Sequence, residues 1–238
     1  MAQLQQGYRH AHQMYGTAAI PTQQKTVDAQ QQKFDTAYTK AIKSIQATLE
    51  HPSNYVDSFV INEISKVGQV YAVLKEQISQ WMQCKNAPLA NAKNQELGVY
   101  VAVLKKQKMY QTLCKMLSPM VGHKKSIQAE AAKTLSIIAH RPNRYRDAKW
   151  YDQKQKHIAL AELHINDSEY NTLILISYIL IQFQHENDTD YFQKTDNVRL
   201  IAHTLRLLAN VVNHNSDVVL KCKQYEFISH ILQILNDE

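Results

Sequence analysis

The sequence predicts an all-α fold, and three observations support this prediction. The 238 residues include only five Gly and five Pro, too few for the turns that a many-stranded β fold needs. Residues that favour helices, above all Gln, Ala, Leu, Lys and Glu, are common along the chain. Apolar residues also recur at intervals of three and four, the spacing of one helix face. With 45% hydrophobic residues, the chain can fill a core without outside help.

Three long helices are predicted in the first half of the chain. The first begins at Val27, and its apolar stripe consists of Phe34, Tyr38, Ala41, Ile45 and Leu49. The stripe of the second consists of Val60, Ile64, Val67, Tyr71, Leu74, Ile78 and Trp81. This stripe indicates one half of an antiparallel helix pair, with a coiled-coil seam as the alternative. The third helix is expected from about Ala92 to Leu117, after a break at Asn86 to Pro88.

Two stretches of the second half, residues 127–143 and 200–235, resemble each other. When Leu135 is aligned with Leu208, four further pairs coincide: Ile127 with Leu200, Ala129 with Ala202, Ala132 with Leu205, and Ile138 with Val211. A small helical unit cannot bury its apolar face alone, so repeated units stack on one another. Between the two stretches, residues 169–184 predict a helix that is apolar nearly all round and too short to span a membrane.

The second stretch resembles an armadillo repeat. Its Leu208, Asn210 and Val211 are similar to the Leu-x-Asn-Leu of that family. The apolar positions of the last helix of the repeat are matched by Ile228, Ile231, Ile234 and Leu235. Two positions depart from the family, because Glu226 stands where it commonly has Gly and Ile137 replaces its Asn in the earlier stretch. The resemblance implies a right-handed α-α superhelix, an armadillo-like or HEAT-like solenoid with long amino-terminal helices.

Three regions follow from this reading. Residues 1–25 are expected to be a disordered arm, residues 26–120 a bundle of long helices or a cap, and residues 121–238 armadillo-like helical repeats. The long helices would cover one end of the stack, because two or three repeats need a cap over their apolar end face. Whether residues 26–120 are themselves repeats stays open. The other end, near Leu232, is expected to be exposed and able to bind a neighbouring chain.

The resemblance also implies a binding groove. In armadillo proteins the third helices line a concave groove that holds an extended peptide, and Asn side chains clamp the peptide backbone. Asn210 would hold that position here, and Ile137 takes the equivalent place in the earlier stretch. Importin-α-type grooves carry a Trp one helical turn earlier to grip basic peptides, whereas this chain has Lys133 and Arg206. We therefore expect these four residues to hold an acidic segment, unless the two cations are ordinary exposed helix residues.

Positive charge is concentrated in the middle of the chain. The net charge is +6, and between Leu104 and Lys156 thirteen Lys or Arg residues accompany only three acidic residues. The predicted basic surface consists of Lys105, Lys106, Lys124, Lys125, Arg141, Arg144 and Arg146. Aromatic residues are interleaved with these cations, a mixture that suits single-stranded nucleic acid. A helical protein that associates with RNA through residues 104–156 is therefore the alternative function.

No catalytic or metal-binding motif is recognisable in the sequence. A Gly-rich phosphate loop, a GxSxG elbow and an HExxH zinc motif are all missing. His157 and His164 are seven residues apart, too far for joint metal ligation along a straight helix. Cys84, Cys114 and Cys222 are widely spaced, which fits neither a disulfide framework nor a metal hairpin and indicates a reducing compartment. We expect no enzyme activity, no cofactor and no metal.

The predicted function is that of a non-enzymatic adaptor or scaffold subunit in a larger assembly. It would hold a partner segment in a helical groove with a basic surface. The sequence shows no apolar run of the length of a signal peptide and none near the roughly 18 residues of a membrane span. A cytoplasmic location is therefore expected, with the nucleus as the alternative.

Overall fold

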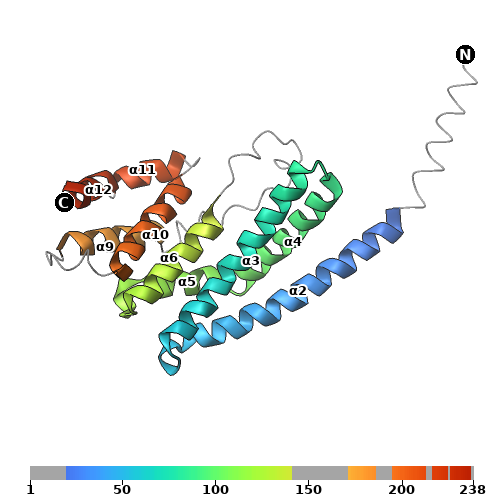
Figure 1. Cartoon of the computed structure of the whole chain (residues 1–238), viewed down its shortest axis with the longest axis horizontal. Coiled ribbons are helices and arrows are strands. Elements are labelled where there is room, and N and C mark those ends of the chain that lie inside the picture. Colours follow the sequence, from blue (N-terminus) through green and yellow to red (C-terminus); the bar gives the residue numbers. More distant parts are fainter. Residues whose placement is uncertain (1–19, 141–170, 186–194, 213–215, 225, 237–238) are drawn as a thin grey trace, which may run out of the picture.

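The described part of the chain is entirely helical. In a computed structural model, residues 20–140, 171–185, 195–212, 216–224 and 226–236 can be described, and they form nine α-helices, two 3-10 helices and no strand (Figure 1). The all-α prediction is confirmed for these residues. No helix among them is long and apolar enough to cross a membrane.

The helices follow one another with short turns in most of the described chain. In order they are α2 (Ile20–Glu50), α3 (Asp57–Gln83), α4 (Ala87–Lys106), α5 (Met109–Leu117), α6 (Lys125–Ala139), α9 (Thr172–His185), α10 (Thr195–Val212), α11 (Ser216–Gln224) and α12 (Phe227–Asn236). Two short 3-10 helices, η1 (Pro52–Asn54) and η2 (Pro119–Val121), lie in the turns before α3 and α6. Figure 1 shows α2 at one end of the molecule and α11 and α12 at the other.

Helices α3 and α6 lie side by side and run in the same direction. Near their starts, the Lys124 ammonium lies 2.5 Å from a carboxylate oxygen of Asp57. Near their ends, the Lys75 ammonium donates a hydrogen bond to the carbonyl oxygen of His140. Because the contacts keep the same order along both helices, the two helices are parallel.

Helix α10 packs in the same way on the opposite side of α6. Arg199, in the second turn of α10, contacts Glu130 of α6. Asn210, in the last turn of α10, donates a hydrogen bond to the carbonyl oxygen of Ser136. The order of the contacts again shows a parallel pair, so α3, α6 and α10 form a row of three parallel helices (Figure 1).

The remaining helices pack against this row. A short turn joins α3 to α4, which returns antiparallel to it, and the Tyr100 hydroxyl donates a hydrogen bond of 2.9 Å to the Val67 carbonyl oxygen. Helix α2 is joined to α4 by a hydrogen bond of 2.6 Å from the Tyr38 hydroxyl to Glu96. Helix α5 packs on α6, and α9 packs on α10 and α12. The α3 stripe thus lies in an antiparallel pair, as the sequence predicted.

One hydrophobic core runs through these helices, and α11 contributes to it only the partly buried Cys222. It extends from Ile42 in α2 to Phe227 in α12. It continues across residue 120, where the sequence suggested a border between long helices and repeats. Among the residues that the structure describes, Tyr100, Tyr110 and Phe227 are the bulkiest fully buried side chains.

The start of α2 and α4 differs from the sequence prediction. Helix α2 begins at Ile20, earlier than the expected Val27, and residues 1–19 of the predicted arm lie outside the described residues. The added residues include two Gln and one Lys, which favour helix even without an apolar stripe. Helix α4 begins at Ala87, because the Asn86 side chain accepts a hydrogen bond of 3.3 Å from the Leu89 amide and caps the first turn.

The predicted single helix from Ala92 to Leu117 is in fact two helices. Lys108 has a φ of 53°, in the left-handed region, and separates α4 from α5. The change of direction at Lys108 allows one face of α5 to enter the core. The buried residues of α5 are Met109, Tyr110, Leu113, Cys114, Met116 and Leu117. Burial of these side chains outweighs the cost of the left-handed residue, which is about 1–2 kcal/mol.

Candidate functional site

Three of the four predicted groove residues lie where α6 and α10 meet. Lys133 of α6 is half-buried, Arg206 of α10 is exposed and Asn210 of α10 is half-buried. The fourth, Ile137, lies on α6 but points toward α3, because its Cδ1 atom is 3.4 Å from where a Cβ of Gly68 would be. The structure therefore divides the predicted groove between the two sides of α6.

We use the name α6–α10 seam for the polar residues along the contact between these two helices. They are Glu130 and Lys133 of α6, His140 directly after α6, and Asp196, Arg199, His203, Arg206 and Asn210 of α10. On α10 these residues recur at intervals of three and four, so they form one stripe. The adjacent stripe of α10 contains Leu200, Leu207 and Val211 and is buried in the core.

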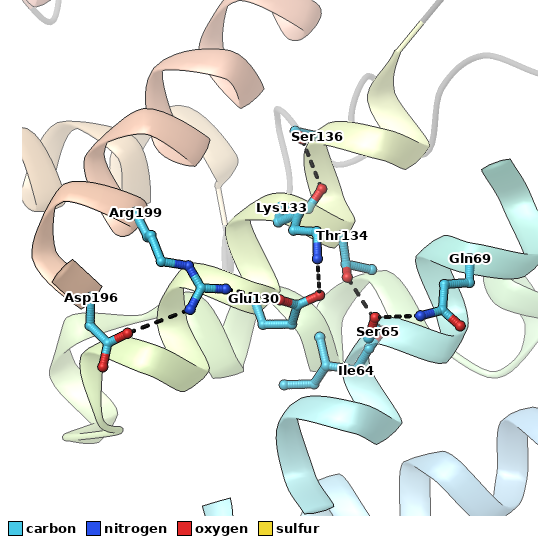
Figure 2. Close-up of polar contacts among 9 residues, drawn as sticks. All are labelled: Ile64, Ser65, Gln69, Glu130, Lys133, Thr134, Ser136, Asp196 and Arg199. Carbon is cyan, nitrogen blue, oxygen red and sulfur yellow. Dashed lines mark hydrogen bonds and ion pairs between the residues drawn. The ribbon is translucent and has the colours of Figure 1, made fainter. Parts of the chain in front are cut away.

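A buried carboxylate lies at the centre of the seam. The Glu130 side chain is only 4% exposed, and its Oε1 atom lies 2.8 Å from the Lys133 ammonium (Figure 2). Its Oε2 atom lies 3.8 Å from the Arg199 guanidinium, which also lies 3.6 Å from Asp196. A carboxylate removed from water needs such partners to compensate its charge. Glu130 thus orients both cations, whose side chains remain 38% and 47% exposed.

The cations of the seam, Lys133, Arg199 and Arg206, outnumber its two carboxylates, Glu130 and Asp196. Burial lowers the pKa of His203, and the nearby Lys133 lowers it further. Arg199 and Arg206 also lower this pKa, and Glu130 raises it without reversing the direction. Burial is the main cause of this lowered pKa, and the cations add to it because they disfavour the charged form of an imidazole. The seam is therefore suited to an anionic group.

Asn210 closes the carboxyl-terminal end of α6. Its Nδ2 atom donates a hydrogen bond of 2.8 Å to the Ser136 carbonyl oxygen, and its Oδ1 atom lies 3.4 Å from the His140 ring nitrogen. The last carbonyls of a helix lack helical donors. Here the backbone amide of His140 donates to the Ile137 carbonyl oxygen and not to the Ser136 carbonyl oxygen. The side-chain amide of Asn210 donates to the Ser136 carbonyl oxygen instead. A peptide clamp at Asn210 stays a prediction, and it would have to compete with this internal bond.

The predicted basic surface is spread over several elements. Lys105 and Lys106 are exposed in the last turn of α4. Lys124 lies 2.5 Å from Asp57, and Lys125 donates a hydrogen bond of 3.2 Å to Gln182. Outside the described residues lie Arg141, Arg144 and Arg146. One of the four described lysines is thus already balanced by an acid.

Sequence reasoning missed the roles of Glu130 and Arg199. Glu130 lies among cations in the sequence and interrupts an otherwise apolar stretch of α6, a signal that a buried ion pair often leaves. Arg199 belongs to the regular polar stripe of α10, which could have been recognised by its spacing of three and four. Their pairing depends on which helices become neighbours, and this is not visible in the spacing.

No protein family, curated protein or solved structure matches this chain. In the described ranges, no three His, Cys, Asp or Glu side chains lie together in a way that could hold a metal ion. The resemblance to armadillo repeats stays a prediction, and the α6–α10 seam is the candidate site that the geometry offers.

Proposed function

We propose that this chain is a non-enzymatic adaptor or scaffold subunit that binds an acidic segment of a protein partner along the α6–α10 seam. The main support is the placement of Lys133 and Arg199 around Glu130, with the exposed Arg206 further along the same stripe of α10. All three cations are at least partly exposed and can reach a partner. Ammonium and guanidinium groups bind carboxylates through charge-assisted hydrogen bonds, and a guanidinium can do so with two parallel bonds.

The exposure of these three cations limits the electrostatic energy that they can contribute to binding. Ion pairs at an exposed surface contribute about 0.2–1 kcal/mol each, so three cations contribute at most about 3 kcal/mol. This energy corresponds to a change of roughly 100-fold in Kd. Salt screens such pairs, so affinity for an acidic segment should fall steeply as ionic strength rises.

We further propose that α3, α6 and α10 are equivalent helices of successive units in a right-handed α-α superhelix. Two features support this proposal. The hydrogen bonds that join the row connect residues at similar distances in sequence, 70 residues from Thr134 to Ile64 and 74 residues from Asn210 to Ser136. In addition, Glu226 has a φ of 53° at the position where armadillo repeats commonly have Gly. A HEAT-like arrangement is the alternative within the same class.

A labelled acidic peptide tests the binding proposal. A Glu-rich peptide of about 12 residues, without apolar residues, would be titrated with the full chain and followed by fluorescence polarisation at about 50 and 300 mM salt. Arg206→Glu is the best variant, because Glu130 keeps both of its cation partners. Reversing Lys133 would instead place a second carboxylate beside the buried Glu130 and destabilise the fold.

The control for Arg206→Glu is Lys43→Glu, which makes the same charge change at an exposed position of α2. We expect Arg206→Glu to raise Kd by about ten-fold at low salt and the control to leave it nearly unchanged. Equal losses in both variants would mean that only net charge matters, and unchanged affinity in Arg206→Glu would remove the seam from consideration.

Association with RNA through residues 104–156 is the alternative proposal. The described residues include four of the seven cations of this basic surface, Lys105, Lys106, Lys124 and Lys125, and Lys124 is paired with Asp57. A single-stranded RNA of about 20 nucleotides would be titrated under the same conditions. RNA that binds more tightly than the acidic peptide, and that is insensitive to Arg206→Glu, would favour this alternative.

A further inference from the structure

An apolar groove lies between α10, α11 and α12. Its volume is about 630 Å³, and apolar side chains from all three helices line it. They include Leu205, Ala209, Val212, Val219, Phe227 and Ile231. Lys223 is the charged residue in the lining. We call this feature the end groove, because it lies at the end of the molecule opposite to the start of α2 (Figure 1).

Large apolar side chains around the end groove remain exposed. Ile228 is 71% exposed, Leu220 64%, Leu232 52% and Val219 51%. Leu232 is thus exposed, as the sequence predicted. Burying one such side chain fully stabilises a protein by about 1.5–3 kcal/mol, and exposed apolar patches of this kind mark interaction sites. Helix α12 packs on α9 and α11, while the face that carries Ile228 and Leu232 remains exposed among the described residues.

The end groove and the α6–α10 seam lie on different faces of α10, and Arg206 lies between them. Arg206 is three residues after His203 of the seam and three residues before Ala209 of the groove. Residues at this spacing are neighbours on a helix surface. Lys223 lies in the last turn of α11. One cation, Lys223 of α11, therefore lies in the lining of the groove, and another, Arg206 of α10, lies next to the lining residue Ala209.

We propose that the end groove is the docking site for an acidic amphipathic helix of the partner protein. Its apolar side chains fill the groove, and its carboxylates lie against Arg206 and Lys223. This inference rests on the proposed function, since it gives the acidic segment a helical form and apolar anchors. A groove between helices suits a helical ligand, which recognises it through residues at i, i+3 or i+4, and i+7.

The size of the groove sets the length of the docked helix. The lining residues of α10 run from Leu205 to Val212. Seven residues of helix rise about 10 Å, or two turns, which accommodates three apolar anchors of a docked helix. Carboxylates beside these anchors would reach Arg206 and Lys223.

The charges favour a different protein over a second copy of this chain. In a two-fold symmetric dimer the same patch meets itself. Arg206 and Lys223 of one copy would then lie near the same cations of the other copy, and like charges repel. The carboxylates of an acidic helix would instead be attracted to these cations. The charge of Arg206 and Lys223 therefore favours an acidic partner over a second copy of this chain.

Three designed peptides test this inference by fluorescence polarisation with the full chain. The first is a helix of about 16 residues with Leu at i, i+4 and i+7 and Glu on both flanks. The second has Lys in place of every Glu, and the third has Ser in place of every Leu. We expect the first peptide to bind at least about ten-fold more tightly than either of the others.

Two protein variants locate the binding site of the first peptide. Ile228→Asp places a carboxylate at the groove, and because Ile228 is 71% exposed the fold should persist. Leu220→Asp serves as a second groove variant. Val73→Asp, at an apolar residue of α3 that is 50% exposed, is the matched control. Both groove variants should raise Kd by about ten-fold, and the control should not.

The outcomes separate this inference from the proposed function. One outcome is that Arg206→Glu weakens binding, whereas Ile228→Asp, Leu220→Asp and the replacement of Leu by Ser in the peptide do not. In that case the seam binds acidic segments and the groove inference is overturned. Equal binding of the Lys peptide also overturns it. So does a dimer of the free protein, seen by analytical ultracentrifugation, that both groove variants abolish, because the groove would then belong to a second copy.

Discussion

The cap that α10 provides for α6 makes Asn210→Ala the most informative substitution in this chain. Ala cannot donate to the Ser136 carbonyl, which Asn210 reaches at 2.8 Å, and Ser136 is 1% exposed. The lost hydrogen bond costs about 1 kcal/mol, and a buried carbonyl left without a donor costs about 1–3 kcal/mol. The better helix propensity of Ala returns roughly 0.6 kcal/mol.

The expected net loss is therefore about 1–3 kcal/mol of unfolding free energy. For a chain of this length, 1 kcal/mol lowers Tm by about 2–4 °C. Chemical denaturation followed by circular dichroism measures the loss directly. Asn62→Ala is the matched control, because Asn62 is exposed on α3 and its replacement should leave stability unchanged or slightly raised.

The same variant separates a structural cap from a peptide clamp. If Asn210 serves mainly to cap α6, Asn210→Ala loses stability while the folded fraction binds the acidic peptide with nearly the affinity of the original chain. A variant as stable as the original chain would refute the capping role. A stable variant that also lost the peptide would indicate that Asn210 contacts the partner instead.

Three further predictions concern backbone and charge. At Gly68 a Cβ would lie 3.3 Å from the Thr134 side chain, so Gly68→Val should lower the free energy of unfolding, measured by chemical denaturation, by about 1–3 kcal/mol. Gly68→Ala should lower it less, because the higher helix propensity of Ala offsets part of the steric cost. Glu226→Gly should stabilise the chain by about 1 kcal/mol, because its φ is 53°. The pKa of His203 is lowered from 6.5, so the unfolded state takes up its proton first, and stability should fall as pH decreases below about 6.5. His203→Gln should reduce this fall, and an unchanged pH profile would contradict the assignment.

The apolar spacing of the sequence was enough to locate most of the helices. In α3, six residues of the predicted stripe, from Val60 to Ile78, are buried, and Trp81 at its end is 36% exposed. Such a stripe reports which side of a helix meets the core, whatever helix it meets there. The same reasoning placed α6 and α10 within the two similar stretches.

Features that depend on neighbouring helices could not be predicted in this way. The break at Lys108 is one, since nothing in the residues around it forbids a continuous helix, and only burial of α5 explains the left-handed residue. The pairing of Glu130 with Arg199 is another, because it joins residues 69 positions apart. The end groove likewise arises from three helices together, although the exposure of Leu232 was expected from the position of α12.

The parallel row of α3, α6 and α10 has a consequence for synthesis on the ribosome. Each helix of the row must wait for its next neighbour, since Ser136 is joined to a residue 74 positions later. At about 5–20 residues per second, translation of that interval takes roughly 4–15 s. During this time the side of α6 that will meet α10 is uncovered, including the carboxylate of Glu130 without Arg199. The nascent chain therefore presents a partly apolar surface to chaperones for seconds before α10 arrives to cover it.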